Sequence, residues 1–260
     1  MRIIRFSAGG RARYGILAGN MIRGLYGNPC SHLGHLNSPS ILDGTTYSLD
    51  KVRLLSPCLP SKIICLGLNY RSHIEEMKLP MPSVPLIFLK PSTAVIGPED
   101  KIILPPGWQR IDYEGELGVV IGKKAKDVPE DRAREYVLGY TCVNDVSDRH
   151  AQAADGQWTR AKGYDTFAPI GPWIETEAEP DNLKLETFLN GELRQSASTS
   201  DLLFGVPKLI NFISSVMTLL PGDVIATGTP SGVGPMNPGD VVEIRIEKIG
   251  TLKNFVAAPD

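Results

Sequence analysis

One segment of the sequence, residues 206–220, has apolar residues at helical spacing over enough turns to predict a helix that packs on a core. Pro221 and Gly222 would end this helix. The other apolar runs are short and bounded by glycine, proline or asparagine, which is typical of strands. The sequence therefore predicts a mainly β fold of the α+β class, with helices at its periphery. The apolar stripe of the predicted helix consists of Val206, Leu209, Ile210, Ile213, Val216, Met217 and Leu220.

The predicted strands form two groups along the chain. Residues 1–58 contain short strands separated by glycine turns, so we expect a small N-terminal β subdomain. Residues 59–260 contain longer strands and are predicted to form the main domain, with Asn190 and Gly191 as a two-residue hairpin turn. A second helix is predicted in PEDRAREY, which begins at Pro129.

The composition disfavours several classes of protein. Hydrophobic residues make up 42% of the 260 residues, enough for a sizeable core. The 27 basic and 29 acidic residues leave a net charge of −2 without a basic cluster, so we expect no nucleic-acid partner. No apolar run approaches the length of a membrane span or a secretory signal, so we expect no membrane partner and a cytoplasmic location. The cysteines lie far apart without a C-x-x-C pair, which favours reduced thiols: Cys30, Cys58, Cys65 and Cys142.

Two motifs contain ligand-type residues but lack the context of a ligand site. Cys30, His32 and His35 are possible zinc ligands, but no second pair follows, so we interpret their segment as a polar loop. The glycine-rich segment Gly228–Asp240 is followed by a strand instead of the helix of a phosphate-binding loop. We interpret it as a structured turn that could line a pocket through Thr229.

The segment DYEGEL leads into the apolar run GVVIG, so an acidic row precedes a predicted buried strand. Side chains alternate along a strand, which places Asp112, Glu114 and Glu116 on one face, with neighbours roughly 7 Å apart. Three carboxylates in a partly desolvated site require a cation or have raised pKa values. The alternative is a face that is simply solvated.

The segment GLNYRSHIEEM predicts a short helix that carries a general base. Ser72, followed three residues later by a glutamate, forms a capping-box pattern, so we expect the helix to begin near His73 and to end before Pro80. His73 and Glu76 would then share one helical face, where the carboxylate can orient the imidazole. The alternative is a solvated surface helix with an incidental pair.

Two further segments contain candidate site residues. Asp145 follows a buried strand, where metal ligands are common, and Arg149 and Gln152 follow at helical spacing. Arg149 suits the bidentate binding of a carboxylate. Lys162 lies among many aromatic residues, where it could stabilise an enolate or bind a substrate carboxylate. The alternatives are an aspartate that caps the next turn and a lysine whose ammonium reaches solvent.

The order of these motifs resembles the fumarylacetoacetate hydrolase family. NYRSHIEE, DYEGEL, the ND that precedes Arg149 and Gln152, AKGYDTFAPIGPW and TGTPSGVGPMNPGD follow one another over about residues 60–260. The chain is also similar to bacterial members with a small N-terminal β subdomain. The resemblance implies a mixed β-roll in residues 59–260, a divalent metal, Mg²⁺ or Mn²⁺, and a homodimer.

The resemblance also implies a role for each candidate residue. The implied metal ligands are Glu114, Glu116 and Asp145; the implied catalytic residues are His73 and Glu76, on a lid that ligand orders, with Lys162; the implied substrate contacts are Arg149, Gln152 and Thr229. Asn69 stands where the fumarylacetoacetate hydrolases proper have a fourth metal-binding aspartate, which favours the acylpyruvate-type branch.

These roles predict a metal-dependent hydrolase that cleaves a C–C bond in an acylpyruvate-type or related 2-oxo dicarboxylic acid through an enolate. His73, assisted by Glu76, would activate water, and Lys162 would balance the charge of the enolate. The alternative is an isomerase, tautomerase or decarboxylase of 2-hydroxy-enoic or 2-oxo dicarboxylates such as oxaloacetate, because these reactions share the enolate. A metal-binding protein without catalysis is a further alternative, which His73 and Glu76 disfavour.

Overall fold

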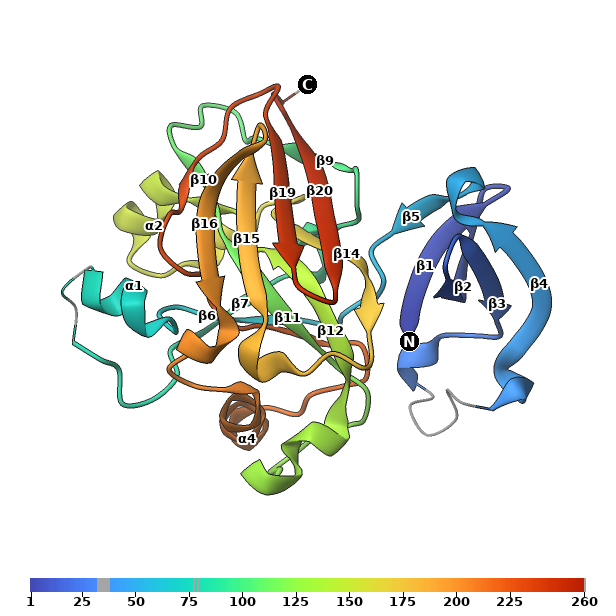
Figure 1. Cartoon of the computed structure of the whole chain (residues 1–260). Coiled ribbons are helices and arrows are strands. Elements are labelled where there is room, and N and C mark those ends of the chain that lie inside the picture. The colour runs from blue at the N-terminus through green and yellow to red at the C-terminus, as the bar shows by residue number, and fades with distance from the viewer. Residues whose placement is uncertain (32–37, 77, 79, 260) are drawn as a thin grey trace.

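The computed structural model of the chain describes residues 1–31, 38–76, 78 and 80–259 (Figure 1). Strands dominate it and the helices are short and peripheral, which confirms the predicted mainly β, α+β fold. The strands are β1 Arg2–Ala8, β2 Arg11–Ala18, β3 Met21–Leu25, β4 Leu42–Ser48, β5 Arg53–Leu55, β6 Ile63–Leu66, β7 Ile87–Lys90, β8 Val95–Ile96, β9 Lys101–Ile103, β10 Ile111–Tyr113, β11 Gly115–Ile121, β12 Val137–Asn144, β13 Ser147–Asp148, β14 Ala168–Glu175, β15 Lys184–Leu189, β16 Glu192–Ser198, β17 Val224–Ala226, β18 Gly234–Pro235, β19 Val241–Ile246 and β20 Gly250–Ala257. The α-helices are α1 Arg71–Glu76, α2 Arg149–Asp155, α3 Thr159–Lys162 and α4 Val206–Val216, and 3₁₀ turns lie at Pro29–Ser31, Pro39–Ile41, Leu49–Lys51, Ser92–Ala94, Glu130–Tyr136, Pro180–Asn182 and Thr199–Asp201.

The strands form mixed sheets. The largest has the order β4-β3-β2-β1-β14-β12-β11-β17-β6-β7, with β5 paired to β1 and β8 to β14. A second sheet has the order β16-β15-β19-β20-β9, and the short strands β13-β10-β18 form a third. Most neighbours are antiparallel, while β17 and β6 pair in parallel.

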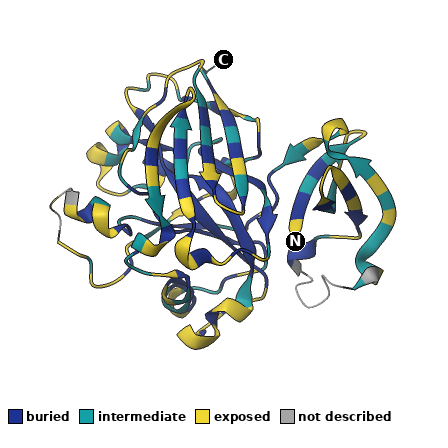
Figure 2. Cartoon of the chain, viewed as in Figure 1, coloured by how far each residue is buried: buried dark blue, intermediate teal, exposed yellow. Residues whose placement is uncertain are grey.

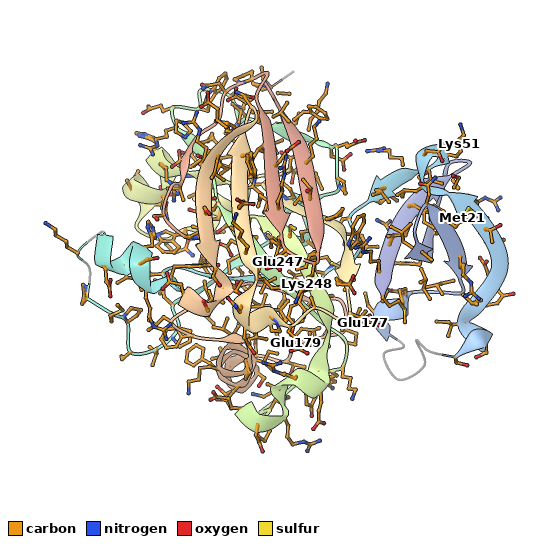
Figure 3. The ribbon with its side chains drawn as sticks, viewed as in Figure 1. Met21, Lys51, Glu177, Glu179, Glu247 and Lys248 are labelled. Atoms are coloured by element: carbon orange, nitrogen blue, oxygen red, sulfur yellow. The ribbon has the colours of Figure 1, made fainter. Side chains whose placement is uncertain are left out.

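The first five strands form a small β unit that stands beside the rest of the chain (Figure 1). Strand β1 joins this unit to the main sheet, because Arg2 and Ile3 pair with the end of β14. The N-terminal amine also donates to Glu175 at 2.8 Å and lies 3.3 Å from Glu177, which is labelled in Figure 3. The division into a subdomain of residues 1–58 and a domain of residues 59–260 stays a prediction.

Strands β11 and β12 are the buried centre of the molecule (Figure 2). Every residue of β11 is buried, because β12 and β17 flank it and apolar layers cover both faces. Leu117 and Val119 pack in the layer that contains α4 and the second sheet, and Val120 packs in the opposite layer. The acidic row therefore enters a buried strand, as the sequence predicts.

Helix α4 ends earlier than its apolar pattern predicts. Its stripe is buried through Ile213, but the chain becomes extended at Met217 and Leu219 pairs with Ala125. Val216 and Leu220 are consequently 56% and 41% exposed, so their assignment to the core is wrong.

Other local predictions have mixed outcomes. The segment after Pro129 is helical but forms 3₁₀ turns. The hairpin at Asn190 and Gly191 is confirmed: both residues have positive φ, 53° and 81°, between the paired strands β15 and β16.

The cysteines confirm the prediction of reduced thiols, since all four are buried and free. Cys30 packs in an apolar layer with Cys58 and Cys65. His32 and His35, from the predicted polar loop, lie outside the described residues. In the described part of the chain, no helix has the length and apolar character needed to cross a membrane.

Candidate active site

Three buried carboxylates meet where strand β11 begins and its neighbour β12 ends. Glu114 precedes β11, Glu116 is its second residue, and Asp145 follows β12. The antiparallel register pairs Gly115 with Asn144, and the Asp145 N–H donates to the Glu114 carbonyl at 2.9 Å. One oxygen from each carboxylate lies within 4.8 Å of the others. We call Glu114, Glu116 and Asp145 the acid cluster; it is buried, so the alternative of a solvated face is wrong.

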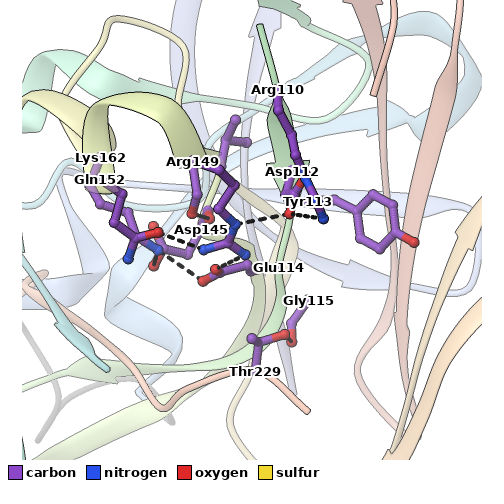
Figure 4. Close-up of polar contacts among 12 residues, drawn as sticks. Arg110, Asp112, Tyr113, Glu114, Gly115, Asp145, Arg149, Gln152, Lys162 and Thr229 are labelled. Carbon is purple, nitrogen blue, oxygen red and sulfur yellow. Dashed lines mark hydrogen bonds and ion pairs between the residues drawn. The ribbon is translucent and has the colours of Figure 1, made fainter. Parts of the chain in front are cut away.

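Asp112, the first acid of the row, lies outside the acid cluster. It accepts hydrogen bonds from Arg110 and from Arg149, whose Nε lies 2.9 Å from Oδ2 (Figure 4). The strand is interrupted at Glu114, and Asp112 belongs to β10 in the small third sheet. The three acids of DYEGE therefore do not lie on one face of a single continuous strand, as predicted, because Asp112 belongs to another strand.

Glu116 has the buried carboxylate oxygen that best fits a cation ligand. Its Oε2 accepts the Gly228 N–H at 2.7 Å, but its buried Oε1 has no hydrogen-bond partner among the described residues. Burial, followed by the nearby Asp145 and Glu114, raises the pKa of Glu116 well above its ordinary value. A buried acceptor without a partner is unfavourable, and a hard cation would satisfy it.

Lys162 bridges two members of the acid cluster. It ends α3, is 2% exposed, and its Nζ lies 2.9 Å from Glu114 Oε2 and 2.6 Å from Asp145 Oδ2. Burial alone would lower the pKa of the Lys162 ammonium, but Asp145 and Glu114 raise it above its usual value. The alternative of an ammonium that reaches solvent is therefore wrong.

Lys90 is a charged residue of the site that the sequence analysis missed. It ends β7, is 1% exposed, and its Nζ lies 2.5 Å from Asp145 Oδ1 and 3.0 Å from the Val146 carbonyl. Asp145 thus binds one lysine on each oxygen, while Asp148 caps α2 by accepting the Ala151 N–H. A lysine that ends an apolar strand, as in LIFLK, was the available signal.

Arg149 and Gln152 occupy the first turn of α2. The Arg149 Nη2 lies 2.6 Å from Glu114 Oε1, and its Nη1 donates to Gln152 at 2.8 Å. Burial would raise the pKa of Glu114, but Lys162 and then Arg149 lower it to about 2. The pKa of Glu114 is therefore lowered while the pKa of Glu116 is raised, although the two carboxyl groups are neighbours.

The glycine-rich turn brings Thr229 and a backbone donor to the site. Thr229 donates to the Gly115 carbonyl at 3.0 Å and accepts from Gln195 at 2.8 Å. Gly228 has φ of 98°, which favours glycine, and it supplies the N–H that binds Glu116. Gln195, on β16, also accepts the Gly115 N–H and was not predicted from the sequence.

Helix α1 places His73 at the cavity. It begins at Arg71 and His73 is half-buried, but the predicted capping box is not formed. The N–H and hydroxyl of Ser72 both donate to Asp201, which lies far away in the sequence. Glu76 ends α1, and its side chain lies outside the described part of the structure.

Asn69 is buried but binds backbone groups instead of the acid cluster. Its Nδ2 donates to the carbonyls of Phe204 and Thr227, at 3.0 and 2.8 Å, and its Oδ1 accepts the Phe204 N–H. An ionised aspartate has no N–H donor for the two carbonyls. The amide therefore fixes the turn that leads to Gly228.

A cavity of about 550 Å³ is lined by six of the nine predicted site residues, while Glu116 and Asp145 are buried beside Glu114 and are not among its lining residues. Its walls combine a charged side, next to the acid cluster, with a larger apolar side. The lining residues are Leu66, Gly67, Leu68, His73, Leu86, Phe88, Arg110, Asp112, Glu114, Arg149, Gln152, Trp158, Lys162, Thr229 and Val233. This arrangement can bind an organic anion with a carbon skeleton.

A cluster whose ligand atoms are all carboxylate oxygens is the kind of ligand set that a hard divalent cation prefers. The model of the family described as "Fumarylacetoacetate (FAA) hydrolase C-terminal" matches residues 62–257, and the model "Rv2993c-like, N-terminal" matches residues 1–57. The chain belongs to the fumarylacetoacetate hydrolase family, and its sheets form the mixed β-roll predicted from that resemblance.

Relatives of the chain carry different activities in their names. A protein of Archaeoglobus fulgidus is 56% identical over 220 residues, 85% of this chain and 88% of that protein. The structure of 5-carboxymethyl-2-hydroxymuconate delta-isomerase from Mycobacterium smegmatis is 45% identical, with a TM-score of 0.92 over 100% of both chains. Maleylpyruvate hydrolase from Sphingobium sp. SYK-6, solved with manganese(II) and pyruvate, is 33% identical, with a TM-score of 0.82 over 100% of both chains. A mitochondrial oxaloacetate tautomerase of Bos taurus is 42% identical over 219 residues, 79% of this chain and 70% of that protein.

Proposed function

We propose that the chain is a divalent-metal-dependent hydrolase that cleaves a C–C bond in an acylpyruvate-type or related 2-oxo dicarboxylic acid. The observation that carries this proposal is the acid cluster: three buried carboxylates within 4.8 Å of one another, one with an unpartnered oxygen, beside a cavity lined by cations. Maleylpyruvate hydrolase, which resembles this chain along its whole length, supports the reaction class.

Glu114, Glu116 and Asp145 fit a Mg²⁺ or Mn²⁺ ion, because all their donors are oxygens and one oxygen lacks a partner among the described residues. When bound, the ion would polarise the 2-oxo group of the substrate and stabilise negative charge on it. In the protein alone, Lys162 and Lys90 supply part of the compensating charge.

The cations of the site would bind and stabilise the substrate. Lys162 lines the cavity, so its ammonium can balance the enolate released by bond cleavage. Arg149 is held by Asp112 and Glu114, which fixes its guanidinium beside the cavity, and the second N–H of each Nη remains to donate to a substrate carboxylate. Gln152 and Thr229 add neutral hydrogen-bonding groups to the same wall.

His73 is the proposed general base. It lies on α1 and lines the cavity that would hold the substrate. We propose that His73, oriented by Glu76, takes a proton from the water that attacks the distal carbonyl. The leaving fragment is then the enolate of a 2-oxo acid, which takes up a proton to form the ketone.

Proton transfer without hydrolysis is the second candidate. The Mycobacterium smegmatis isomerase and the Bos taurus tautomerase favour it by their names, and most of the cavity lining is apolar, which limits the water inside. The same metal and Lys162 would serve an isomerase, tautomerase or decarboxylase of 2-hydroxy-enoic or 2-oxo dicarboxylates such as oxaloacetate.

A panel assay tests the proposal. The metal-loaded protein is incubated with acylpyruvates, oxaloacetate and 2-hydroxyhepta-2,4-diene-1,7-dioate, while products and enol absorbance are followed together. Cleavage of an acylpyruvate into two acids is the expected result. Loss of the enol signal without cleavage of any substrate would show an isomerase or tautomerase instead of a hydrolase. Release of CO₂ would show a decarboxylase.

We propose a homodimer in the cytoplasm, acting on a small 2-oxo dicarboxylate without a nucleic-acid or membrane partner. Size-exclusion chromatography with light scattering measures the oligomeric state directly, and a monomer would contradict it.

A further inference from the structure

Arg110 and Arg149 both line the cavity, but their guanidinium groups differ in how many nitrogens bind other residues. Its Nε and Nη2 donate to Asp112 at 2.9 and 3.1 Å, while its Nη1 makes no hydrogen bond to the described residues. All three nitrogens of Arg149 are engaged, with Asp112, Gln152 and Glu114. Arg110 lines the cavity, and its side chain is 55% exposed. It therefore keeps a donor for a ligand.

Arg110 lies at the far end of a row of charges that starts at the acid cluster. Arg149 bridges Glu114 and Asp112, and Asp112 in turn binds Arg110 (Figure 4). Among the described residues, Arg110 pairs with Asp112 but with no member of the acid cluster, to which it is connected through Asp112 and Arg149. A ligand held at the acid cluster must extend through the cavity to meet Arg110.

The charges around the cavity suit a ligand with two negative charges. The cations and carboxylates that line the cavity or contact the acid cluster are equal in number: Lys90, Lys162, Arg110 and Arg149 against Asp112, Glu114, Glu116 and Asp145. A divalent metal on the acid cluster leaves two positive charges in excess. A dianion neutralises both, whereas a monoanion leaves one positive charge of the site uncompensated.

The apolar lining suits the carbon chain between two carboxylates. Leu86, Phe88 and Trp158 contribute to the cavity wall together with Leu68 and Val233. Phe88 and Trp158 pack edge to face with their ring centroids 5.1 Å apart, so this wall is well ordered by its own contacts.

We propose that Arg110 is a specificity-determining residue that binds the distal carboxylate of the substrate. The site then selects dianionic 2-oxo acids over acylpyruvates with an uncharged acyl end. This inference rests on the proposed function, since it takes the acid cluster to hold the 2-oxo acid end.

The first test compares turnover of two substrates of equal chain length, succinylpyruvate and butanoylpyruvate, which differ in one terminal carboxylate. Arg110→Met should lower the ratio of their kcat/KM values about 10-fold, the low end for a charged hydrogen bond because the side chain is half exposed. Arg110→Lys should restore part of the ratio. Arg160→Met is the matched control, because Arg160 also pairs with an aspartate and is 58% exposed but does not line the cavity; its ratio should equal that of the wild type.

The second test measures binding, independently of turnover. The fluorescence of the Mn²⁺-loaded protein is titrated with 2-oxoadipate and with 2-oxohexanoate, since Trp158 lines the cavity. Arg110→Met should weaken the dicarboxylate about 10-fold more than the monocarboxylate. Equal losses for both ligands, or none, would overturn the role of Arg110 even if the enzyme hydrolyses acylpyruvates. If Arg110→Met selectively weakens the dicarboxylate but the wild-type protein cleaves no acylpyruvate, the proposed role of Arg110 is supported and only the proposed reaction is overturned.

Discussion

The Glu116→Gln substitution should stabilise the metal-free protein. Relative to the ionised carboxylate, glutamine keeps the acceptor for the Gly228 N–H at 2.7 Å and replaces the unpartnered Oε1 with a donor that can bind Glu114 or Asp145 within the 4.8 Å cluster. A buried acceptor without a partner costs about 1–3 kcal/mol. For a chain of this size, each kcal/mol corresponds to about 2–4 °C in Tm, so the variant should melt several degrees higher in a chelator.

The difference in stability between Glu116→Gln and the wild type should grow as the pH rises. Burial, Asp145 and Glu114 raise the pKa of Glu116, so the folded protein keeps a proton that the unfolded chain releases. Stability from a raised carboxyl pKa is present at low pH and is lost as the pH rises from the unfolded value, about 4.3, to the folded value. In a chelator, the wild type should therefore lose stability relative to Glu116→Gln as the pH rises.

Metal should reverse the order of the two proteins. Mn²⁺ at 100 times its Kd stabilises the wild type by about 2.7 kcal/mol, while the variant lacks one of the three anionic ligands. Asp223→Asn is the control, since Asp223 is equally buried but accepts bonds from Ser61, Lys62 and Leu220, and it should lower Tm with or without metal. The reasoning fails if the wild type melts higher than Glu116→Gln in the chelator, or if Mn²⁺ raises both Tm values equally.

Other substitutions separate the roles of the remaining charged residues. Asp145→Ala should abolish both Mn²⁺ binding in equilibrium dialysis and turnover, because it removes a ligand and the shared partner of Lys90 and Lys162; unchanged binding would exclude Asp145 as a ligand. Asp112→Ala should lower Tm, because two arginines lose their partner, yet leave Mn²⁺ affinity nearly unchanged; a large loss of affinity would place Asp112 in the metal site. His73→Ala should keep metal and ligand binding but lose hydrolysis by about 10²- to 10⁴-fold, while keto–enol exchange falls much less; intact hydrolysis would assign the base to another residue.

The acid cluster is predictable from the sequence because its residues lie at the ends of two neighbouring strands. Glu114 and Glu116 are separated by one residue, and the pairing of β11 with β12 brings Asp145 to them. Strand alternation and the order of motifs therefore contain the information needed. The fold class is predictable for a similar reason, since short apolar runs and one helical stripe are local patterns.

Contacts between distant segments were not predictable. Lys90 meets Asp145 from β7, and Gln195 reaches the site from β16. The sequence marks Lys90 only as a lysine that ends an apolar strand and does not identify its partner, and Gln195 stands in no recognisable motif. The capping box fails because Asp201 takes both donors of Ser72. A long-range partner of this kind overrides a local pattern, and only the tertiary structure identifies it.

Metal-dependent cleavage at the acid cluster is tested most directly by titrating the chelator-treated protein with Mn²⁺ while acylpyruvate cleavage and bound metal are measured in the same samples. The account predicts negligible cleavage in the chelator, and an increase that saturates at one Mn²⁺ per chain and is absent from Asp145→Ala. Cleavage that persists in the chelator, or an equal response of Asp145→Ala to Mn²⁺, would contradict it.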